Sequence, residues 1–274
     1  MDTPPNLRPD AFAGTAAAYL RYRPPYPKAL LDDLLSHTAA PSAGALLDLA
    51  CGPGRVVLDL ADVFDRVWAI DLEPEMIDVG KREAARRGIG HVNWLVGRAE
   101  DLELAPCSLD LITIGEAFHR LDQLLIARKA LDWLKPGGWL ATLGTDGVLA
   151  GREPWQKTAA EVARRWTIRA FPAGWAQGRP GADIGPGAGE RVMRKAGFAD
   201  VESRTFLEPR DWSFEDILGY LKSTSVCSEK ALGKDFADFE AGLAAALANE
   251  HGPFHEDLNC GYTVGRRRTS RPSD

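Results

Sequence analysis

The sequence lacks long apolar runs and has few cysteines. No stretch approaches about 18 consecutive apolar residues, so no segment is predicted to span a membrane. Residues 1–10 are polar and proline-rich, without the basic and then apolar segments of a secretory signal. The four cysteines lie far apart and form no Cys-x-x-Cys pair, which indicates neither a disulfide framework nor a zinc ribbon. We therefore expect a cytoplasmic protein whose thiols are free.

An excess of positive charge is also missing. The chain has 33 Lys and Arg against 39 Asp and Glu, a formal net charge of −6, which provides no field for a phosphate backbone. One short basic tail is present and is interpreted as solvated chain: Arg266, Arg267, Arg268 and Arg271. His251 and His255 have the spacing of a helical metal pair, but the Gly-Pro dipeptide between them breaks a helix. We expect no nucleic acid, no membrane and no metal as a partner.

The sequence does contain an alternation of short apolar runs and helical patterns. With 274 residues, 45% of them hydrophobic, the chain can bury a sizeable core. Between Ala45 and Asp146 the alternation is typical of a parallel sheet covered by helices. The expected strands are 46–49, 67–70, 92–96, 109–114 and 139–144, and the helices between them are 55–63, 75–87 and 124–134. A Lys-Pro-Gly-Gly run is expected to close the last helix.

Two further strands, 201–206 and 261–265, and a helix at 235–248 complete the pattern. We predict an α/β fold, a doubly wound, Rossmann-like, mostly parallel sheet of seven strands with helices on both faces. A single domain is expected, with an N-terminal helical lid at 1–44, a core at 45–146, an insertion after the fifth strand at 147–197, and closing strands and helix at 198–274. The insertion carries tryptophans and a glycine-rich run, and such insertions are often lids or substrate walls.

A glycine loop follows the first expected strand and leads into a helix. Small residues in the segment Asp48 to Gly54 let the backbone approach a ligand closely. A dinucleotide loop would need a third glycine where this chain has Val57. Asp71 ends the second strand, 17 residues after Gly54, close to the spacing of a carboxylate that binds both ribose hydroxyls. A ribose without a pyrophosphate therefore fits better than a dinucleotide.

Successive motifs resemble those of a known family. The runs L-D-L-A-C-G-P-G, A-I-D-L-E-P-E-M, G-R-A-E-D-L, L-D-L-I-T-I-G-E-A-F-H and L-K-P-G-G are similar to the motifs of class I S-adenosylmethionine-dependent methyltransferases, in the methyltransferase type 11 group. This resemblance covers 46–144, and segments 22–27 and 220–225 resemble a branch of small-molecule or uncharacterised methyltransferases. One departure is Ala50, where the family usually has glycine. Alanine permits close approach there if its φ is negative.

The resemblance implies a site for S-adenosylmethionine, whose product is S-adenosylhomocysteine. The backbone of Ala50 and Gly52 would line the methionine portion, and the carbonyl of Gly115 would accept from its ammonium group. Asp48, at the end of the first strand, either belongs to this site or only organises the N–H groups of the loop.

The resemblance also implies contacts with the nucleoside. Asp71 would bind the ribose hydroxyls, and Leu72 and Met76 would cover the adenine. Ala99 would meet the adenine edge through its backbone N–H, and Glu100 would accept from the exocyclic amine. The alternative for the two acidic residues is that they are exposed surface charges.

A third group of residues is expected near the acceptor and the cofactor carboxylate. Tyr19 and Arg23 could hold that carboxylate if the N-terminal helix folds over the cofactor, although Arg23 could also be a surface residue. Phe118, His119 and Trp175 are the candidates for acceptor binding. His119 follows the fourth strand, and its ordinary pKa suits a general base. The alternatives for His119 are a donor that positions the acceptor and a packing residue.

These observations predict an S-adenosylmethionine-dependent methyltransferase that acts on a small organic molecule by in-line attack on the methyl group, as a monomer or homodimer. Two other classes stay open. A nicotinamide-dependent oxidoreductase is weakened by the missing third glycine, and a non-catalytic module that binds S-adenosylmethionine is distinguished by turnover with an acceptor.

Overall fold

The computed structural model of the chain describes residues 7–39, 43–172, 174, 178–250 and 253–269. The chain divides into two compact units. The core unit consists of Tyr26–Gly144, Gln177–Phe206 and Cys260–Asp274, and the helical unit consists of Met1–Pro25, Thr145–Ala176 and Leu207–Asn259. The expected insertion 147–197 thus contributes residues to both units, and its description as one substrate-side segment of a single domain stays a prediction.

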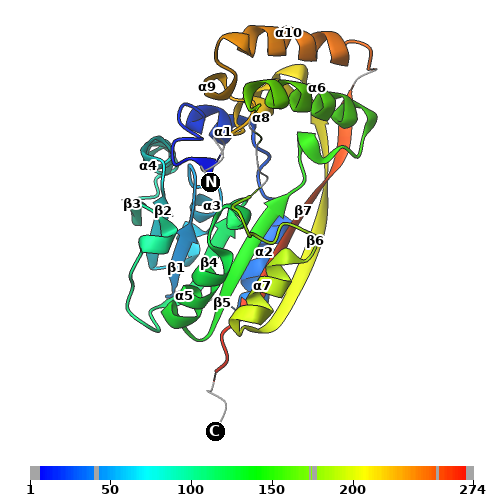
Figure 1. Cartoon of the computed structure of the whole chain (residues 1–274). Coiled ribbons are helices and arrows are strands. Elements are labelled where there is room, and N and C mark those ends of the chain that lie inside the picture. Colours follow the sequence, from blue (N-terminus) through cyan, green and yellow to red (C-terminus); the bar gives the residue numbers. More distant parts are fainter. Residues whose placement is uncertain (1–6, 40–42, 173, 175–177, 251–252, 270–274) are drawn as a thin grey trace. The chain divides into compact units, whose positions relative to one another are not determined.

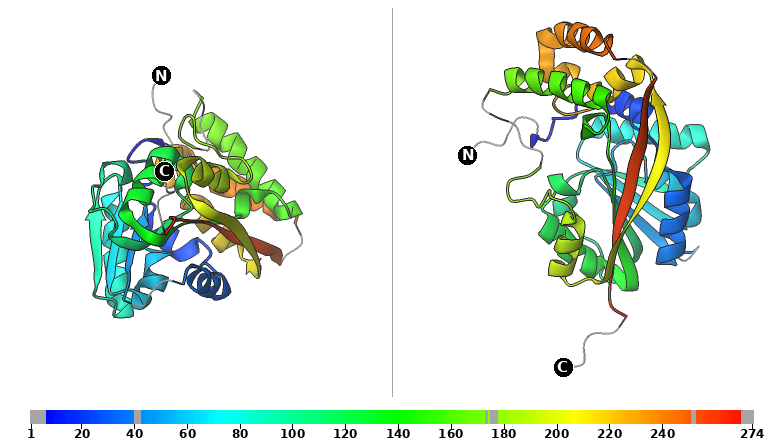
Figure 2. Two further views of the ribbon diagram at one scale, coloured as in Figure 1. Left: turned by 90° about the horizontal axis from the view of Figure 1, so that it is seen from below. Right: turned by 90° about the vertical axis from the view of Figure 1, so that its right-hand side faces the viewer.

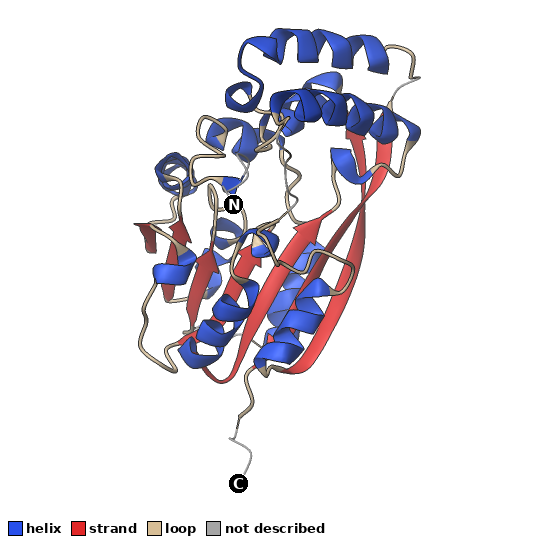
Figure 3. Ribbon diagram, viewed as in Figure 1, coloured by secondary structure: helices blue, strands red, loops and turns tan. Residues whose placement is uncertain are grey.

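One seven-stranded sheet runs through the described chain, in the order β3-β2-β1-β4-β5-β7-β6 (labelled in Figure 1; strands red in Figure 3). The strands are β1 (Ala45–Leu49), β2 (Arg66–Asp71), β3 (Val92–Val96), β4 (Leu109–Gly115), β5 (Leu134–Thr145), β6 (Ala199–Trp212) and β7 (Phe254–Arg266). The pairs β1–β2, β2–β3, β1–β4 and β4–β5 are parallel. Backbone bonds join residue 137 to 267 and residue 146 to 259, so β7 runs antiparallel to β5. The predicted mostly parallel, Rossmann-like sheet is confirmed.

Helices cover both faces of the sheet in the core unit. There, α5 and α7 lie on one face, and α2 and α4 lie on the other (Figures 1 and 2). In the helical unit, α6 packs against α10, and α1 packs against α8. The helices are α1 (Ala16–Tyr22), α2 (Lys28–Thr38), α3 (Val57–Leu60), α4 (Pro74–Arg87), α5 (Gln123–Trp133), α6 (Pro154–Ala170), α7 (Ala188–Ala196), α8 (Phe214–Lys222), α9 (Glu229–Leu232) and α10 (Phe236–Leu247).

Local sequence explains where the core helices begin and end. Pro74 occupies the first position of α4, where its missing N–H costs nothing, and Gly88 ends the helix at a φ of 75°. Asp122 caps α5 by accepting from the backbone N–H of Leu125 at 3.2 Å. Because these residues mark helix ends, the predicted helices 75–87 and 124–134 agree closely with α4 and α5.

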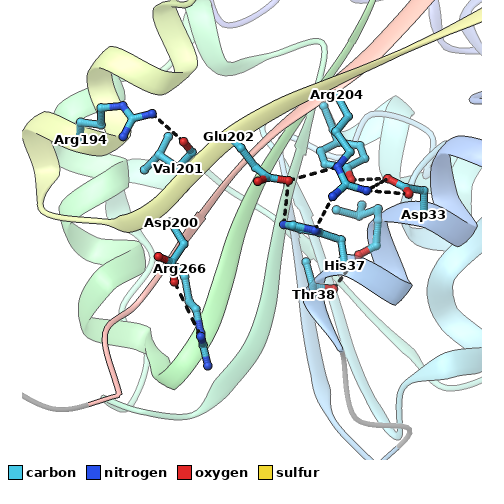
Figure 4. Close-up of polar contacts among 11 residues, drawn as sticks. Asp33, His37, Thr38, Arg194, Asp200, Val201, Glu202, Arg204 and Arg266 are labelled. Atoms are coloured by element: carbon cyan, nitrogen blue, oxygen red, sulfur yellow. Dashed lines mark hydrogen bonds and ion pairs between the residues drawn. The ribbon is translucent and has the colours of Figure 1, made fainter.

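Polar side chains connect α2 to β6 and β7, the two strands at one edge of the sheet. Arg204 on β6 reaches Asp33 at 2.8 Å and His37 at 3.0 Å, both on α2 (Figure 4). Glu202 lies 3.2 Å from the other ring nitrogen of His37, and Tyr262 of β7 donates to Asp33. This network joins a segment near the N-terminus to the last strands of the core unit.

Three strands are longer than their sequence patterns predict. β5 begins at Leu134, which pairs with Leu109, so the Lys-Pro-Gly-Gly run lies inside the strand and does not close α5 as expected. Gly138 suits this position, because a Cβ there would stand 3.0 Å from the backbone oxygens of Asp110 and Lys135. β6 and β7 also extend well beyond 201–206 and 261–265. Strand pairing supplies hydrogen bonds that local sequence does not reveal.

The basic tail is partly structural, which corrects its interpretation as solvated chain. Arg267 donates to the carbonyl oxygen of Asp132 at 3.1 Å and to that of Leu134, at the end of α5. The guanidinium of Arg266 lies over the ring of Trp139, 5.7 Å from its centroid. The orphan carbonyls at a helix C-terminus attract such cations. Arg271 and His251 lie outside the described residues.

The described tryptophans of the helical unit pack against other aromatic residues of that unit. Trp155 is buried and donates through Nε1 to the carbonyl of His255 at 3.0 Å, while its ring centroid lies 6.2 Å from that of Trp212. Trp166 packs edge-on against Phe239 of α10. Trp175 lies outside the described residues. In the described ranges no helix is long and apolar enough to cross a bilayer.

Candidate functional site

The glycine loop between β1 and α3 uses left-handed backbone at three positions. Gly52 and Gly54 have φ of 54° and 88°, and Ala50 has φ of 52°. The condition of a negative φ, under which alanine was expected to permit close approach, is therefore not met at Ala50. Ala50 adopts a left-handed backbone conformation that favours glycine, because the loop must turn immediately after β1. The N–H of Cys51 donates to the carbonyl of Ile70 at 3.0 Å and holds this turn against β2.

Asp48 is buried at the end of β1. Its Oδ1 accepts from the hydroxyl of Thr113, on the neighbouring β4, at 2.7 Å. Burial raises the pKa of Asp48 to about 7, although hydrogen bonds from Thr113 and from the backbone of Val57 act to lower it. Asp48 therefore connects β1, β4 and the start of α3. This placement agrees with its proposed role in organising the loop.

Asp71 stands at the carboxyl end of β2 and binds the glycine loop. Its Oδ2 accepts from the N–H of Gly52 at 2.8 Å, and its Oδ1 accepts from the N–H of Glu73 at 2.9 Å. Burial raises the pKa of Asp71, while these N–H groups and the charge of Arg120 act in the opposite direction. The backbone N–H of Leu72 also bonds to this carboxylate, which has about four acceptor positions in all. Asp71 is thus held in one orientation with acceptor capacity to spare.

Trp94 of β3 packs against two glycines, a relation that sequence reasoning missed. A Cβ on Gly54 would lie 2.8 Å from the indole of Trp94, and a Cβ on Gly80 of α4 would lie 2.6 Å from it. Larger residues at either glycine would push the indole away. The glycine loop is consequently supported from β3 as well as from β2.

The residues assigned to the adenine differ in exposure. Leu72 is 39% exposed, directly after Asp71, whereas Met76 and Ala99 are buried at 3% and 5%. An exposed leucine beside a buried methionine provides apolar surface next to the carboxylate. The three residues follow β2 and β3 at the edge where the parallel strands end.

Glu100 already has several partners in the core unit. Its Oε1 accepts from the N–H of Asp122 at 3.1 Å and lies 3.4 Å from Nη1 of Arg179, and its Oε2 lies 3.5 Å from Arg98. Arg179 was not found from the sequence, because some eighty residues separate it from Glu100 and no motif connects them. Glu100 therefore joins the segment after β3 to the start of α5.

Gly115 ends β4 at a crowded point. A Cβ there would stand 2.9 Å from Val56 and 3.1 Å from the hydroxyl oxygen of Tyr26, so only glycine fits. Tyr26 is 5% exposed, and the guanidinium of Arg55 lies 5.9 Å from its ring centroid. Sequence reasoning noted the segment 22–27 but assigned Tyr26 no role. Its ring brings the N-terminal side of the core unit to the carboxyl end of β4.

His119 lies in a short turn after β4, between Phe118 and Arg120. Its carbonyl accepts from the N–H of Arg179 at 2.9 Å, which fixes the backbone of the turn. Phe118 is buried in the core cluster, beside Ala117. The structure thus brings His119, Glu100 and the end of β4 to one side of the core unit, and gives Phe118 a packing role there.

Tyr19 and Arg23 belong to the helical unit. Arg23 donates to the hydroxyls of Ser223 at 2.8 Å and Tyr220 at 3.1 Å, and its guanidinium lies 4.9 Å from the ring centroid of Tyr19 and 4.3 Å from that of Tyr220. The two flanking segments that resemble one methyltransferase branch, 22–27 and 220–225, therefore meet through Arg23. Cofactor binding by Tyr19 and Arg23 stays a prediction.

The sheet order, the glycine loop after β1 and the acidic residue that ends β2 are the features of a Rossmann-like core. Residues 46–138 match a family described as a methyltransferase domain. These residues are therefore a methyltransferase domain, and the resemblance to class I S-adenosylmethionine-dependent methyltransferases is confirmed.

Several relatives are similar over parts of their length. The chain is 40% identical over 102 residues to a ubiquinone/menaquinone biosynthesis C-methyltransferase of Rubrivivax gelatinosus, covering 36% of this chain and 39% of that protein. It is 33% identical over 148 residues to a ubiquinone biosynthesis O-methyltransferase of Xanthomonas campestris, covering 53% and 58%. The chain spans about half the length of these curated relatives, or less.

Solved structures share the fold. The YcgJ protein of Bacillus subtilis superposes with a TM-score of 0.58 at 16% identity, covering 88% of this chain and 99% of that one. A putative type II methyltransferase of Anaeromyxobacter dehalogenans gives a TM-score of 0.58 at 25% identity, covering 90% and 98%. The α/β methyltransferase fold predicted from the sequence is confirmed.

Proposed function

We propose that this protein is an S-adenosylmethionine-dependent methyltransferase that modifies a small organic molecule. The observation that carries the proposal is Asp71, oriented by the N–H groups of Gly52 and Glu73 at the end of β2, within the methyltransferase domain. A carboxylate held in this way accepts from two ribose hydroxyls without reorganising.

The nucleoside end of the site fits an adenosine. Leu72 offers exposed apolar surface next to Asp71, and Met76, which is buried on α4, is proposed to cover the adenine with it. The backbone N–H of Ala99 and the carboxylate of Glu100 are proposed to meet the adenine edge. Val57 is buried at the start of α3, where a dinucleotide loop would have its third glycine, and this favours a ligand without a pyrophosphate.

The methionine end is proposed to lie along the glycine loop. Ala50 and Gly52 would present backbone to the ligand, Asp48 would keep the loop in place, and the carbonyl of Gly115 would accept from the ammonium group. S-adenosylmethionine supplies an electrophilic methyl group on its sulfonium sulfur. The chain's own contribution is to hold the acceptor in line with that group, and such positioning is worth up to ~7–11 kcal/mol.

His119 is proposed to deprotonate the attacking hydroxyl or amine of the acceptor. Its backbone is fixed by Arg179 after β4, on the side of the core unit that also carries Glu100. General-base catalysis contributes typically 10²- to 10⁴-fold, so His119 would be secondary to positioning. The alternative role, a donor that orients the acceptor, predicts a smaller loss of turnover and no change in the pH profile.

A small organic acceptor is favoured by two observations. The net charge of −6 disfavours a nucleic-acid substrate, and the relatives named above are, by their names, enzymes of ubiquinone or menaquinone biosynthesis. We also propose that the enzyme acts in the cytoplasm as a monomer or homodimer.

Calorimetry with three ligands tests the proposal. We expect S-adenosylmethionine and S-adenosylhomocysteine to bind and NAD not to bind. Incubation with methyl-labelled S-adenosylmethionine and a panel of small phenols, amines and quinols should then transfer label to one of them. NAD binding would point to an oxidoreductase, and tight S-adenosylmethionine binding without transfer to any acceptor would point to a non-catalytic module.

A further inference from the structure

A segment that follows the helical region of the expected insertion is fastened to the turn that carries His119. This segment, residues 178–185, belongs to the core unit and is called the strap. The N–H of Arg179 donates to the carbonyl of His119 at 2.9 Å. Gly178 approaches so closely that a Cβ on it would stand 2.6 Å from the same oxygen. The backbone of the strap is therefore bonded to and closely packed against the backbone of His119.

The far end of the strap is held by a buried side-chain amide. Gln123, 7% exposed, donates to the carbonyl of Asp183 at 2.9 Å and accepts from its N–H at 2.7 Å. Arg191 of α7 binds both carboxylate oxygens of Asp183, at 2.6 and 2.7 Å. The strap is thus bonded at both ends and is not a loose connection, although its glycines would suggest one.

The side chain of Arg179 provides a second connection. Its guanidinium lies 3.4 Å from Oε1 of Glu100 and 3.4 Å from the carboxylate of Asp122. One residue therefore contacts the proposed adenine acceptor through its side chain and the proposed catalytic turn through its backbone. The side chain of Glu100 is only 12% exposed, whereas that of Arg179 is 41% exposed, so a partly solvated guanidinium meets a mostly buried carboxylate.

We propose that Arg179 is a positioning residue, which orients Glu100 toward adenine and, through the strap, makes the turn of His119 respond to cofactor binding. The inference rests on the proposed function of Glu100 and His119. A hydrogen bond from the adenine amine to Glu100 would stiffen the Glu100–Arg179 pair, and the strap bonded to it would become more ordered. By linkage, loosening the strap must weaken adenine binding to the same extent.

The test combines hydrogen exchange with ligand discrimination in the full chain. In the native protein, saturating S-adenosylhomocysteine should slow amide exchange at 178–184 by about fivefold or more, the lower range of such couplings. The native protein should also prefer S-adenosylhomocysteine over its deaminated analogue, S-inosylhomocysteine. Arg179→Ala should abolish the change in exchange and lower this preference about threefold or more, and Arg179→Lys should restore part of both.

Two controls separate positioning from general damage. Arg98→Ala removes a second cation that lies 3.5 Å from Glu100 and leaves the strap residues unchanged, so the exchange response at 178–184 should persist. Gly178→Ala should disturb the turn of His119, whereas Gly185→Ala, whose Cβ would meet nothing closer than 3.5 Å, should not. If the native protein does not bind S-adenosylhomocysteine, the proposed function fails. If it binds with the expected preference but Arg179→Ala behaves like the native protein, the positioning role is overturned and the function stands.

Discussion

Each unit contains a carboxylate in a polar network. The two networks differ in whether the carboxylate can accept further hydrogen bonds from a ligand. In the core unit, Asp71 accepts from backbone N–H groups, among them those of Gly52 in the glycine loop and of Glu73 after β2. In the helical unit, Glu256 is 4% exposed and accepts from side chains, the indole of Trp212 at 2.6 Å and the amide of Gln156. Burial raises the pKa of both carboxylates.

The difference lies in the partners. Gln156 is itself fully buried and also donates to the carbonyl of Gly147. The partners of Glu256 are thus buried protein groups, and their hydrogen bonds join α6 to β6 and β7. Asp71 stands at a strand end beside exposed Leu72, where further donors can reach it. A carboxylate with a raised pKa is therefore not by itself a functional site. Its open hydrogen-bonding capacity and its place at the end of a strand distinguish the two cases.

The largest expected effect concerns Asp48, the buried carboxylate beside the glycine loop. Its folded pKa of about 7 lies above the unfolded value of 3.8, so folding takes up a proton between these values and its stabilising effect is lost as pH rises toward 7. From pH 5 to pH 8 this group should lower the free energy of unfolding by ~3 kcal/mol, at 1.36 kcal/mol per pKa unit.

Asp48→Asn keeps an acceptor for Thr113 but removes the titration. Urea unfolding of both proteins at pH 5 and pH 8 should show the variant gaining ~3 kcal/mol relative to the native protein between the two pH values. Equal pH slopes in the two proteins would mean that Asp48 stays ionised in the folded state.

Asp71→Ala should weaken binding of S-adenosylmethionine by about 10- to 150-fold, or ~1.5–3 kcal/mol, because two ribose hydroxyls lose a charged acceptor. Calorimetry measures the affinity, and Asp62→Ala, which removes an exposed carboxylate of the same unit, serves as the matched control. Unchanged affinity with an intact fold would show that Asp71 does not bind the cofactor and that, like Glu256, it has only a structural role.

Trp212→Phe should destabilise the fold by about 1–3 kcal/mol, since it leaves a buried carboxylate oxygen of Glu256 without its donor. Trp155→Phe is the control in the same cluster, because that indole donates to a neutral carbonyl and its loss costs about 0.5–1.5 kcal/mol. Denaturant unfolding compares the two variants. S-adenosylhomocysteine affinity should stay unchanged in both, and a selective loss of affinity in Trp212→Phe would assign Glu256 to a ligand site.

The smallest effect is expected at the glycine loop. Ala50→Gly should relieve the left-handed strain and stabilise the fold by ~1 kcal/mol or less, because glycine also gains freedom in the unfolded chain. Ala39→Gly, at a φ of 44° after α2, should give a similar gain far from the loop. Thermal unfolding measures both. Destabilisation by Ala50→Gly alone would show that the methyl group packs favourably in the turn.

Motifs that lie within one short stretch of the chain could be predicted from the sequence alone. The glycine loop and the turn of His119 follow strands, and Asp71 ends one, so periodicity and spacing place them at one edge of a parallel sheet. The lengths of β5, β6 and β7 could not be predicted from the sequence. Glu256 interrupts the apolar alternation of β7, and the Lys-Pro-Gly-Gly run hides the start of β5.

By itself, the sequence determined the Rossmann-like class, the methyltransferase domain and the candidate nucleoside residues, since all of these depend on local order along the chain. Only the tertiary structure decided that Tyr26 meets Gly115, that Trp94 supports the glycine loop, and that Arg179 reaches both Glu100 and His119. It also decided that Ala50 is left-handed. These contacts join residues far apart in the chain, and the close packing and hydrogen bonds that select them exist only when the strands and helices are assembled.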